Sequence, residues 1–332
     1  MLERKLGKSG PAVSAIGLGC MGMSEDFYGP ADRGESIATL HAALEAGVTL
    51  IDTGDFYGMG HNEMLIGEGL KGSSKREKAV ISVKFGALRG PDGSWSGYDG
   101  RPKAVKNFLA YSLKRLGVDH IDIYRPARLD PDVPIEETVG AIADLIKAGY
   151  VRHVGLSEVG AETIRRAAAV HPIADLQIEY SLISRGLEAK ILTTLRELGI
   201  GLTAYGVLSR GLISGHWTAA KAGQTDFRRH SPRFQGENLT RNLTLVENLR
   251  AVAERLGASV AQVAIAWVLG QGSDIVPLIG ARRRERLAES LGALKLSLSP
   301  QDMKALAEAV PPEAVAGERY APAQMAHLDS EK

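Results

Sequence analysis

Cysteine and long apolar runs are scarce in this chain, and each scarcity excludes a class of protein. Cys20 is the only cysteine among 332 residues, so the chain cannot form an internal disulfide and suits a reducing compartment. No segment approaches the roughly 18 apolar residues of a membrane-spanning helix. The N-terminal segment is charged and lacks the apolar stretch of a signal peptide. We therefore expect a cytoplasmic protein with no membrane partner.

An excess of charge of either sign is also missing. Lysine and arginine total 40, and aspartate and glutamate total 39, so no electrostatic feature indicates a nucleic-acid partner. No two histidines have the spacing of metal ligands, and we expect no metal site. The hydrophobic content of 44% is enough for a large core. These properties favour a globular protein that binds neither nucleic acid nor a membrane.

Short apolar runs alternate with amphipathic stretches along the whole chain. The apolar runs predict strands at residues 14–18, 49–52, 80–84, 120–124, 151–157, 175–178, 201–204 and 274–278. The amphipathic stretches predict helices at residues 33–46, 62–70, 102–116, 135–148, 161–170, 187–198, 243–271 with a break at Gly257, 283–291, and from Ser299 onward. Eight strand–helix units are typical of a (β/α)8 TIM barrel, although a doubly wound sheet alternates similarly. We favour the barrel because polar residues cluster at the C-terminal ends of several strands.

The remaining segments complete an α/β barrel that we expect to be a single domain over residues 1–332. Residues 2–13 predict a hairpin that closes the bottom of the barrel. Residues 209–242 form the longest irregular stretch, and loops of that length are usually functional or disordered. The tail at 311–332 either lies over the mouth of the barrel or is mobile.

The segment from Gly17 to Gly22 matches the dinucleotide-binding pattern G-x-G-x-x-G. That pattern has its usual meaning only when a helix opens at the third glycine. The next residues, 23–30, predict a loop instead. We therefore interpret the glycine-rich segment as a tight turn after the first strand.

Asp52, Tyr57 and Lys84 lie at or just beyond the ends of two neighbouring predicted strands. A tyrosine has an ordinary pKa of about 10 and is a poor acid at neutral pH. A nearby ammonium lowers that pKa, and a carboxylate keeps the lysine charged. The three groups would then protonate a carbonyl oxygen as hydride arrives at its carbon. A structural salt bridge beside a packed tyrosine is the alternative, which composition alone favours.

Several motifs occur in order along residues 4–320. They are Asp52-Thr53-Gly54-Asp55-Phe56-Tyr57-Gly58, Lys84 at the end of the next strand, Gly155-Leu156-Ser157-Glu158, Gln177-Ile178-Glu179-Tyr180-Ser181, Tyr205-Gly206-Val207-Leu208-Ser209-Arg210-Gly211 and the segment from Gly280 to Glu289. Together they resemble the aldo-keto reductase family, in particular its bacterial and plant members similar to pyridoxal reductase and auxin-induced proteins. The resemblance implies a (β/α)8 barrel, NADPH/NADP+ as cofactor and reversible reduction of aldehydes or ketones. It also implies that Tyr57 is the general acid, tuned by Lys84 and Asp52.

The same resemblance implies a nicotinamide site. Ser157, Glu158 and Gln177 are implied as ligands of the carboxamide. Relatives often have Asn at position 158, but a glutamate can still accept a hydrogen bond from the amide. Tyr205 is implied to stack on the nicotinamide ring. Contacts to the pyrophosphate are implied for Gly206, Leu208 and Arg210.

The arginine-rich segment after the last predicted strand is implied to hold the 2′-phosphate of NADPH. Arginine forks match phosphate geometry, and a helix start favours anions, whereas a solvated basic helix face is the alternative. Arg282 and Arg286 are the residues we expect to bind this phosphate. Backbone contacts are implied for Gly280 and Ala281. Glu289 is implied to contact the adenine, beside Ser290, which replaces an asparagine of the family.

The fourth predicted strand departs from the family pattern. Relatives end it with a histidine that orients the substrate carbonyl, and alignment through Arg128 and Asp130 places Ala127 there. A methyl group cannot donate a hydrogen bond, and loss of one such donor typically costs about 10²–10³-fold in rate. His61 is the histidine expected near the mouth, but it also suits a helix start. Our hypothesis for a substitute is Arg125 or a water molecule.

Two functions therefore remain open. One is an NADPH-dependent reductase of aldehydes or ketones that uses Tyr57 and a modified proton relay. The other is an NADPH-binding sensor or regulatory protein with little or no turnover. We favour the enzyme because Asp52, Tyr57 and Lys84 are all retained. Most relatives are monomers, although some of this subgroup assemble, so we expect a monomer that acts on a small carbonyl or alcohol.

Overall fold

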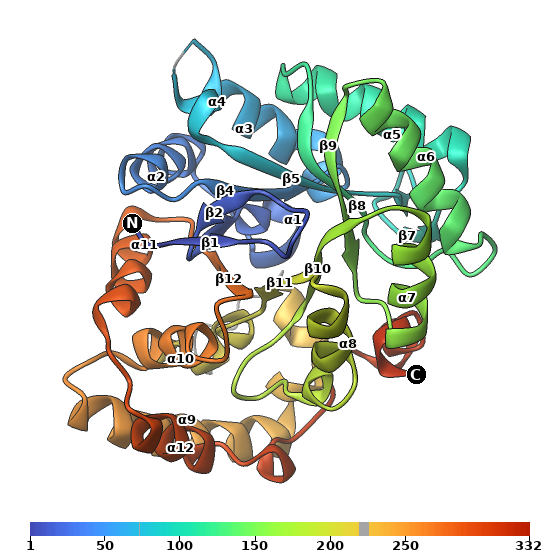
Figure 1. The fold of residues 1–332 in the computed structure, drawn as a ribbon. Helices are drawn as coiled ribbons and strands as arrows, with labels where there is room; N and C mark the ends of the chain where they lie inside the picture. The colour runs from blue at the N-terminus through green and yellow to red at the C-terminus, as the bar shows by residue number, and fades with distance from the viewer. Residues whose placement is uncertain (73, 219–225) are drawn as a thin grey trace.

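Eight parallel strands close into a barrel (Figure 1). The structure, a computed structural model, describes residues 1–72, 74–218 and 226–332. In spatial order the strands are β3 (Gly17–Gly19), β4 (Leu50–Gly54), β5 (Val80–Phe85), β8 (Ile121–Pro126), β9 (Val151–Ser157), β10 (Ile173–Glu179), β11 (Gly201–Tyr205) and β12 (Ile275–Gly280), which pairs with β3. The predicted single-domain (β/α)8 barrel is thereby confirmed.

Helices cover the outside of the barrel, as Figure 1 shows. They are α2 (Arg33–Glu45), α3 (His61–Leu70), α5 (Pro102–Leu116), α6 (Ile135–Lys147), α7 (Ala161–Val170), α8 (Ile191–Leu198), α9 (Gly236–Arg255), α10 (Val260–Leu269), α11 (Arg284–Leu291) and α12 (Pro300–Ala309). Each of the longer helices buries one stripe of side chains. In α5 the stripe includes Val105, Leu109 and Leu116, spaced so that they share the face toward the barrel. These helices begin and end close to the predicted residues, apart from α9.

The first barrel strand starts later than predicted. Residue Ser14 ends the hairpin strand β2 (Ala12–Ser14), whereas β3 starts at Gly17. The reason is that the backbone N–H of Ala15 donates to the carbonyl of Leu2 at 2.8 Å and so extends the hairpin. The glycine-rich segment then leads into a 3-10 turn, η1 (Met21–Met23), and the expected tight turn is present.

The stretch at 209–242 is more regular than predicted. It contains the 3-10 turns η4 (Ser209–Ser214), η6 (Phe227–His230) and η7 (Pro232–Phe234), and α9 already begins at Gly236. Its residues 219–225 lie outside the described part of the chain. The break near Gly257 is present, because α9 and α10 are bent by 85° there. Among the described residues, no single helix has the length and apolarity to cross a membrane.

The N-terminal hairpin closes the lower end of the barrel, as predicted. Strand β1 (Glu3–Lys5) pairs antiparallel with β2. Leu6 and Val13 are buried in one cluster with residues of three barrel strands, namely Leu50, Ile123, Val276 and Leu278. Gly7 has a φ of 62°, and a β-carbon there would lie 2.6 Å from the carbonyl oxygen of Gly199. Only glycine therefore fits the tip of the hairpin against the barrel.

The C-terminal segment returns to the mouth of the barrel. Beyond α12 it contains η9 (Pro312–Ala314), α13 (Pro322–Met325) and η10 (Asp329–Glu331). Asp329 Oδ2 accepts a hydrogen bond from the backbone N–H of Gly160, just after β9, at 2.8 Å. Figure 1 shows the C-terminus beside α7. Of the two interpretations of residues 311–332, packing over the mouth is the one observed.

Candidate active site

The strand order brings Asp52, Tyr57 and Lys84 together at the carboxyl end of the barrel. β4 and β5 are neighbours, with Asp52 opposite Ser82 and Gly54 opposite Lys84. The ammonium of Lys84 donates a hydrogen bond to Asp52 Oδ1 and lies 5.1 Å from the ring centroid of Tyr57. Tyr57 begins the turn η2 (Tyr57–Gly60) directly after β4. All three side chains are buried.

Hydrogen bonds from two other strands hold Asp52. Its Oδ2 accepts from Ser82 Oγ and from Gln177 Nε2, both at 2.8 Å. Since Lys84 binds Oδ1, both carboxylate oxygens have donors. Burial of a carboxylate without such donors would be costly. The carboxylate is therefore fixed beside the ammonium of Lys84.

The protonation of Tyr57 differs from the prediction. Burial raises the pKa of Tyr57 well above its ordinary value, and Asp52 raises it further, whereas Arg128 lowers it in part. Burial also lowers the pKa of Lys84, against the opposing effect of Asp52. The pKa of Tyr57 is therefore not lowered as we expected, because burial and Asp52 outweigh the lowering by Arg128. Tyr57 is therefore held as the neutral phenol, the form that carries the proton.

A buried ion pair lies inside the barrel next to Asp52. Arg125 NH1 is 3.0 Å from Asp175 Oδ2, and both residues are 0% exposed. Arg125 NH2 also donates to Ser82 Oγ at 3.0 Å. Gly155 leaves room for the pair, since a β-carbon there would lie 3.0 Å from Arg125 Cζ and from Asp175 Oδ1. Because its guanidinium is bound inside the barrel, the hypothesis that Arg125 replaces the missing histidine is wrong.

Ser157 and Glu158 follow each other at the end of β9 but have different surroundings. Ser157 Oγ is buried without a hydrogen-bond partner, so it can bind a polar group of a ligand. Both oxygens of the Glu158 carboxylate accept hydrogen bonds. The donors are Arg319 (2.8 and 3.0 Å), Tyr205 OH (2.7 Å), Ser330 Oγ (2.7 Å) and the N–H of Glu179 (3.0 Å). Burial alone would raise the pKa of Glu158, but Arg319 outweighs burial and holds it at about 2. These donors occupy both oxygens of the carboxylate. Glu158 therefore holds the C-terminal segment and has no acceptor left for the carboxamide of a nicotinamide.

Tyr205 and Tyr320 form one wall of the mouth. Their hydroxyl oxygens are 2.9 Å apart. The guanidinium carbon of Arg210 lies 4.4 Å from the ring centroid of Tyr320, and its NH1 donates to the carbonyl of Arg319 at 2.6 Å. The other terminal nitrogen, NH2, is buried without a hydrogen-bond partner. The wall therefore joins β11 to the C-terminal segment and retains one unused donor on Arg210.

The loop after β11 turns through several left-handed residues. Leu208 has a φ of −99° and is followed by Ser209, Arg210 and Gly211 in the left-handed region, with φ values of 45°, 57° and 94°. Gly206 is also left-handed, with a φ of 66°. The N–H groups of Ser209 and Gly211 donate within the loop itself, to Gly206 O at 2.6 Å and to Leu208 O at 2.8 Å. The pyrophosphate contacts predicted for this loop stay a prediction.

Three arginines line a hollow of about 170 Å³ beside this loop. Its lining residues are Gly211, Ser214, His216, Trp217, Arg228, Arg283 and Arg286. Grouped guanidinium groups favour a phosphate ester. Arg286 lines this hollow, whereas the NH1 of Arg282 donates to the carbonyls of Tyr28 and Pro30 at 3.2 and 3.1 Å. Arg228 and Arg283, which the prediction did not include, complete the set of arginines.

Glu289 joins two sides of the arginine-lined hollow. Its carboxylate accepts from His216 Nε2 at 2.8 Å and from Arg286 NH1 at 2.9 Å. The neighbouring Ser290 is buried, as is Ala281, whereas Gly280 is exposed at the end of β12. The residues predicted near the adenine and phosphate therefore lie around the same hollow or next to it along the chain.

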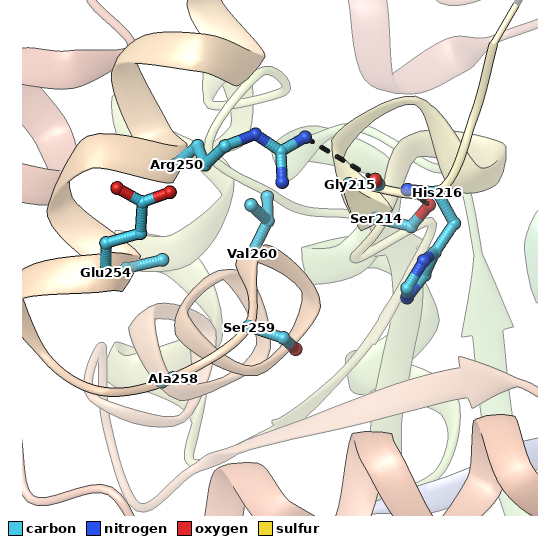
Figure 2. Close-up of a pocket in the computed structure, with 9 residues that line it drawn as sticks. Ser214, Gly215, His216, Arg250, Glu254, Ala258, Ser259 and Val260 are labelled. Atoms are coloured by element: carbon cyan, nitrogen blue, oxygen red, sulfur yellow. Dashed lines mark hydrogen bonds between the residues drawn. The ribbon is translucent and has the colours of Figure 1, made fainter.

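A smaller hollow of about 100 Å³ lies against α9 and α10 (Figure 2). It shares Ser214 and His216 with the arginine-lined hollow. Figure 2 shows Arg250 reaching toward Gly215, whose carbonyl accepts its hydrogen bond at 3.5 Å. Arg250 also pairs with Glu247 at 3.0 Å. With this single arginine in its lining, the smaller hollow is less suited to a phosphate than the larger one.

Aromatic rings surround Tyr57, and Ala127 is buried at the end of the neighbouring strand β8. Phe27 and Phe56 pack edge-to-face against the ring of Tyr57, with centroids 5.6 and 4.8 Å away. Trp95 packs in the same manner on Phe56 at 5.7 Å. Ala127 follows β8, is 2% exposed and donates its N–H to Phe85 O at 2.8 Å. The immediate surroundings of the Tyr57 ring are therefore mainly apolar.

Residues 15–311 match the model of the Aldo/keto reductase family. The chain belongs to this family. A probable aldo-keto reductase 1 from Glycine max is 42% identical over 318 residues, which are 95% of this chain and 91% of that protein. A glycerol dehydrogenase from Gluconobacter oxydans has a TM-score of 0.84 and 28% identity, over 93% of this chain and 96% of its own. The thermostable aldo-keto reductase Tm1743, solved with the inhibitor epalrestat, has a TM-score of 0.75 and 28% identity, over 93% and 100%.

Family membership makes this aldo-keto reductase an oxidoreductase that acts on small carbonyl compounds and uses a nicotinamide cofactor. Its residues fit such a cofactor, because the unpartnered Ser157 hydroxyl lies at the end of β9 and a set of arginines lines the hollow by α11. Reasoning from the sequence missed Arg319, since a tail arginine belongs to no local motif. One signal was available: a glutamate at position 158, where asparagine is common, needs a cation once it is buried.

Proposed function

We propose that this aldo-keto reductase reduces aldehydes or ketones reversibly with NADPH, and that Tyr57 is the proton donor. The observation that carries the proposal is the contact among buried Tyr57, Lys84 and Asp52 at the rim of the barrel. When bound, the cofactor supplies the hydride that reduces the carbonyl carbon. We also propose that the protein is a monomer, as most relatives are.

The proton comes from Tyr57. Burial keeps its phenol protonated, and a phenol within reach of the substrate oxygen is a general acid. The ammonium of Lys84, fixed by Asp52, stabilises the phenolate that remains after the transfer. In the direction of alcohol oxidation the same phenolate takes the proton back. Phe27 and Phe56 cover the ring and limit access of water to it.

We assign the two ends of the cofactor to different sets of residues. Ser157 Oγ and the side-chain carbonyl of Gln177 hold the carboxamide, since the amide nitrogen of Gln177 is already bound to Asp52. Tyr205 stacks on the nicotinamide ring. The phosphates bind the loop after β11 and the arginines of the larger hollow, with Arg282 reserved for the loop at 28–30. Glu158 is left out of this assignment because both of its oxygens are occupied.

Single-turnover oxidation of bound NADPH by activated aldehydes such as nitrobenzaldehyde tests the role of Tyr57. Wild-type protein is expected to oxidise the cofactor, and Tyr57→Phe to do so at least about 10²-fold more slowly, because it lacks the proton. Tyr111→Phe is the matched control, since it removes a hydroxyl from a tyrosine that is 56% exposed. Equal rates for Tyr57→Phe and wild type would contradict the proposed role of Tyr57 as the acid.

The second candidate is an NADPH-binding sensor or regulatory protein with little turnover. Ala127 favours it, because this side of the pocket has a methyl group where relatives have a histidine donor. The same experiment separates the two functions. Tight binding of NADPH without oxidation by any aldehyde would decide for the sensor and against the reductase.

The preference for NADPH over NADH is tested at the larger hollow. Arg286→Met should weaken binding of NADPH by about 10–100-fold, because a hydrogen bond to a charged group contributes about 1.5–3 kcal/mol. Binding of NADH should change little. Arg284→Met is the control, because its guanidinium pairs with Glu35 at 2.9 Å and does not line the hollow. Fluorescence titration with each cofactor measures both constants, and equal weakening for the two cofactors would contradict a 2′-phosphate site.

A further inference from the structure

Arg128 places a cation at the mouth of the barrel without a carboxylate partner. It follows Ala127 just beyond β8, where the chain bends, and its side chain is half-buried. NH1 donates to the carbonyl of Ala127 at 2.6 Å, and NH2 lies 3.4 Å from Tyr320 OH. Over residues 1–72, 74–218 and 226–332, Arg128 forms no ion pair with an acidic side chain. Its guanidinium therefore retains donors for a ligand.

The other cations around the pocket are committed elsewhere. Lys84 is bound to Asp52, Arg125 to Asp175 and Arg319 to Glu158. Arg210 lies on the ring of Tyr320 and 3.9 Å from Glu179. Of these five side chains, Arg128 alone has a charge that no carboxylate neutralises at close range.

The charge of Arg128 affects the pKa of Tyr57, the proposed acid. It opposes the rise that burial causes in the pKa of Tyr57, of Tyr98 and of Tyr205. Burial would lower the pKa of Arg128 itself, but Tyr205, Tyr320, Glu158 and Tyr98 together raise it, so the guanidinium stays protonated. The positive charge of Arg128 therefore acts on Tyr57, the group that is proposed to protonate the substrate.

We propose that Arg128 takes the place of the missing histidine and binds the oxygen of the substrate carbonyl beside Tyr57, an inference that rests on the proposed function. The small side chain of Ala127 leaves room for the guanidinium to turn from its own main chain toward that oxygen. Hydrogen bonds from Arg128 draw electron density from the carbonyl bond as hydride adds to carbon. The oxygen then takes its proton from Tyr57, and Arg128 remains charged and transfers none.

Single-turnover oxidation of bound NADPH by neutral 4-nitrobenzaldehyde tests this role. Arg128→Leu should slow hydride transfer by about 10²-fold, the usual effect of removing one donor from a developing oxyanion. Arg128→Lys should recover part of the rate. Millimolar guanidinium chloride should accelerate Arg128→Ala but not wild type, because the free ion can occupy the space of the deleted group. Adding Ala127→His to Arg128→Leu should also restore turnover.

The controls separate this role from folding and from the proposed function. Arg152→Leu makes the same change at an exposed position at the start of β9 and should leave the rate unchanged. The dissociation constant of NADPH and the thermal unfolding of Arg128→Leu should match wild type. Turnover by wild type that survives Arg128→Leu would overturn the role of Arg128 alone. Absence of turnover in wild type would overturn the reductase and this role with it, and a rate loss without guanidinium rescue would assign Arg128 to structure.

Discussion

At two residues near the rim of the barrel, burial sets the protonation more than neighbouring charges do. Tyr57 stays a phenol for this reason. Asp55, two residues before it, is a second case. Burial raises the pKa of Asp55 to about 8, and the nearby carboxylate of Glu63 adds to the rise. Asp55 Oδ1 is buried without a partner, while Oδ2 accepts from the N–H of Gly86 at 3.3 Å. Asp55 is therefore protonated in the folded protein at neutral pH.

The raised pKa of Asp55 makes stability depend on pH. In the unfolded chain this carboxyl has its ordinary pKa of 3.8. The folded state thus binds the extra proton between pH 3.8 and about 8, so the stability contributed by the neutral acid is complete below 3.8 and is lost as pH rises through 8. Asp55→Asn keeps the shape of the side chain without the charge, and should therefore gain stability relative to wild type as pH rises.

Urea unfolding from pH 5 to 8 measures this gain. The difference in the free energy of unfolding between Asp55→Asn and wild type should grow by up to about 1.4 kcal/mol per pH unit. Asp132→Asn changes an exposed carboxyl in the same way, and its free energy of unfolding should change with pH as that of wild type does. Parallel curves for Asp55→Asn as well would show that Asp55 is ionised in the folded protein.

At the scale of elements, the hairpin and the barrel depend on each other. The guanidinium of Arg4 donates to the carbonyls of Leu269 and Gly272 at 2.8 and 2.7 Å, and the N–H of Lys8 donates to Gly199 O at 2.7 Å. Leu6 packs at the lower end of the barrel against Leu50, Ile123 and Val276. The hairpin thus closes the interior from below, remote from Tyr57 and Lys84 at the other end of the strands.

Truncating a buried side chain of the hairpin should therefore lower stability without changing the cofactor site. Leu6→Ala removes a side chain that is 0% exposed and should reduce the free energy of unfolding by about 2–5 kcal/mol. Leu2→Ala, at a position that is 63% exposed, should change it by less than about 0.5 kcal/mol. Chemical denaturation and NADPH titration measure the two effects. A weakened affinity for NADPH in Leu6→Ala would contradict the separation of hairpin and rim.

At the scale of the whole molecule, one buried ion pair ties the end of the chain to its middle. Arg319 binds Glu158 through two hydrogen bonds, and Glu331 binds Arg319 in turn at 2.6 Å. Glu158 is 0% exposed, and the side chain of Arg319 is 8% exposed. Removing one partner of such a pair leaves a buried charge, whereas removing both charges does not.

Arg319→Met should thus reduce the free energy of unfolding by about 3–5 kcal/mol. The double variant Arg319→Met/Glu158→Gln should recover a large part of that loss, since the uncompensated carboxylate is gone. Urea denaturation of the two single variants and the double variant forms a complete cycle. Additive effects in this cycle would mean that the pair does not connect the C-terminal segment to β9.

Local patterns in the sequence were sufficient to favour the barrel and to bring Asp52, Tyr57 and Lys84 together at its rim. The alternation of apolar runs and amphipathic stretches is a short-range property, so it predicted strands such as 151–157 and helices such as 102–116 at their observed bounds. Asp52, Tyr57 and Lys84 each lie at a strand end, and parallel neighbours bring such ends together. Boundaries failed where a tertiary hydrogen bond decided them, as at Ala15.

By itself, then, the sequence determined the fold, the family and the three residues at the rim, because each depends on order and spacing along the chain. Only the tertiary structure decided how charges are paired. In the folded protein Arg125 pairs with Asp175 and Arg319 pairs with Glu158, while Arg282 donates to the carbonyls of the loop at 28–30. The physical reason is that an ion pair depends on distance in space and on burial. Neither quantity can be read from the spacing of residues that are up to 254 positions apart.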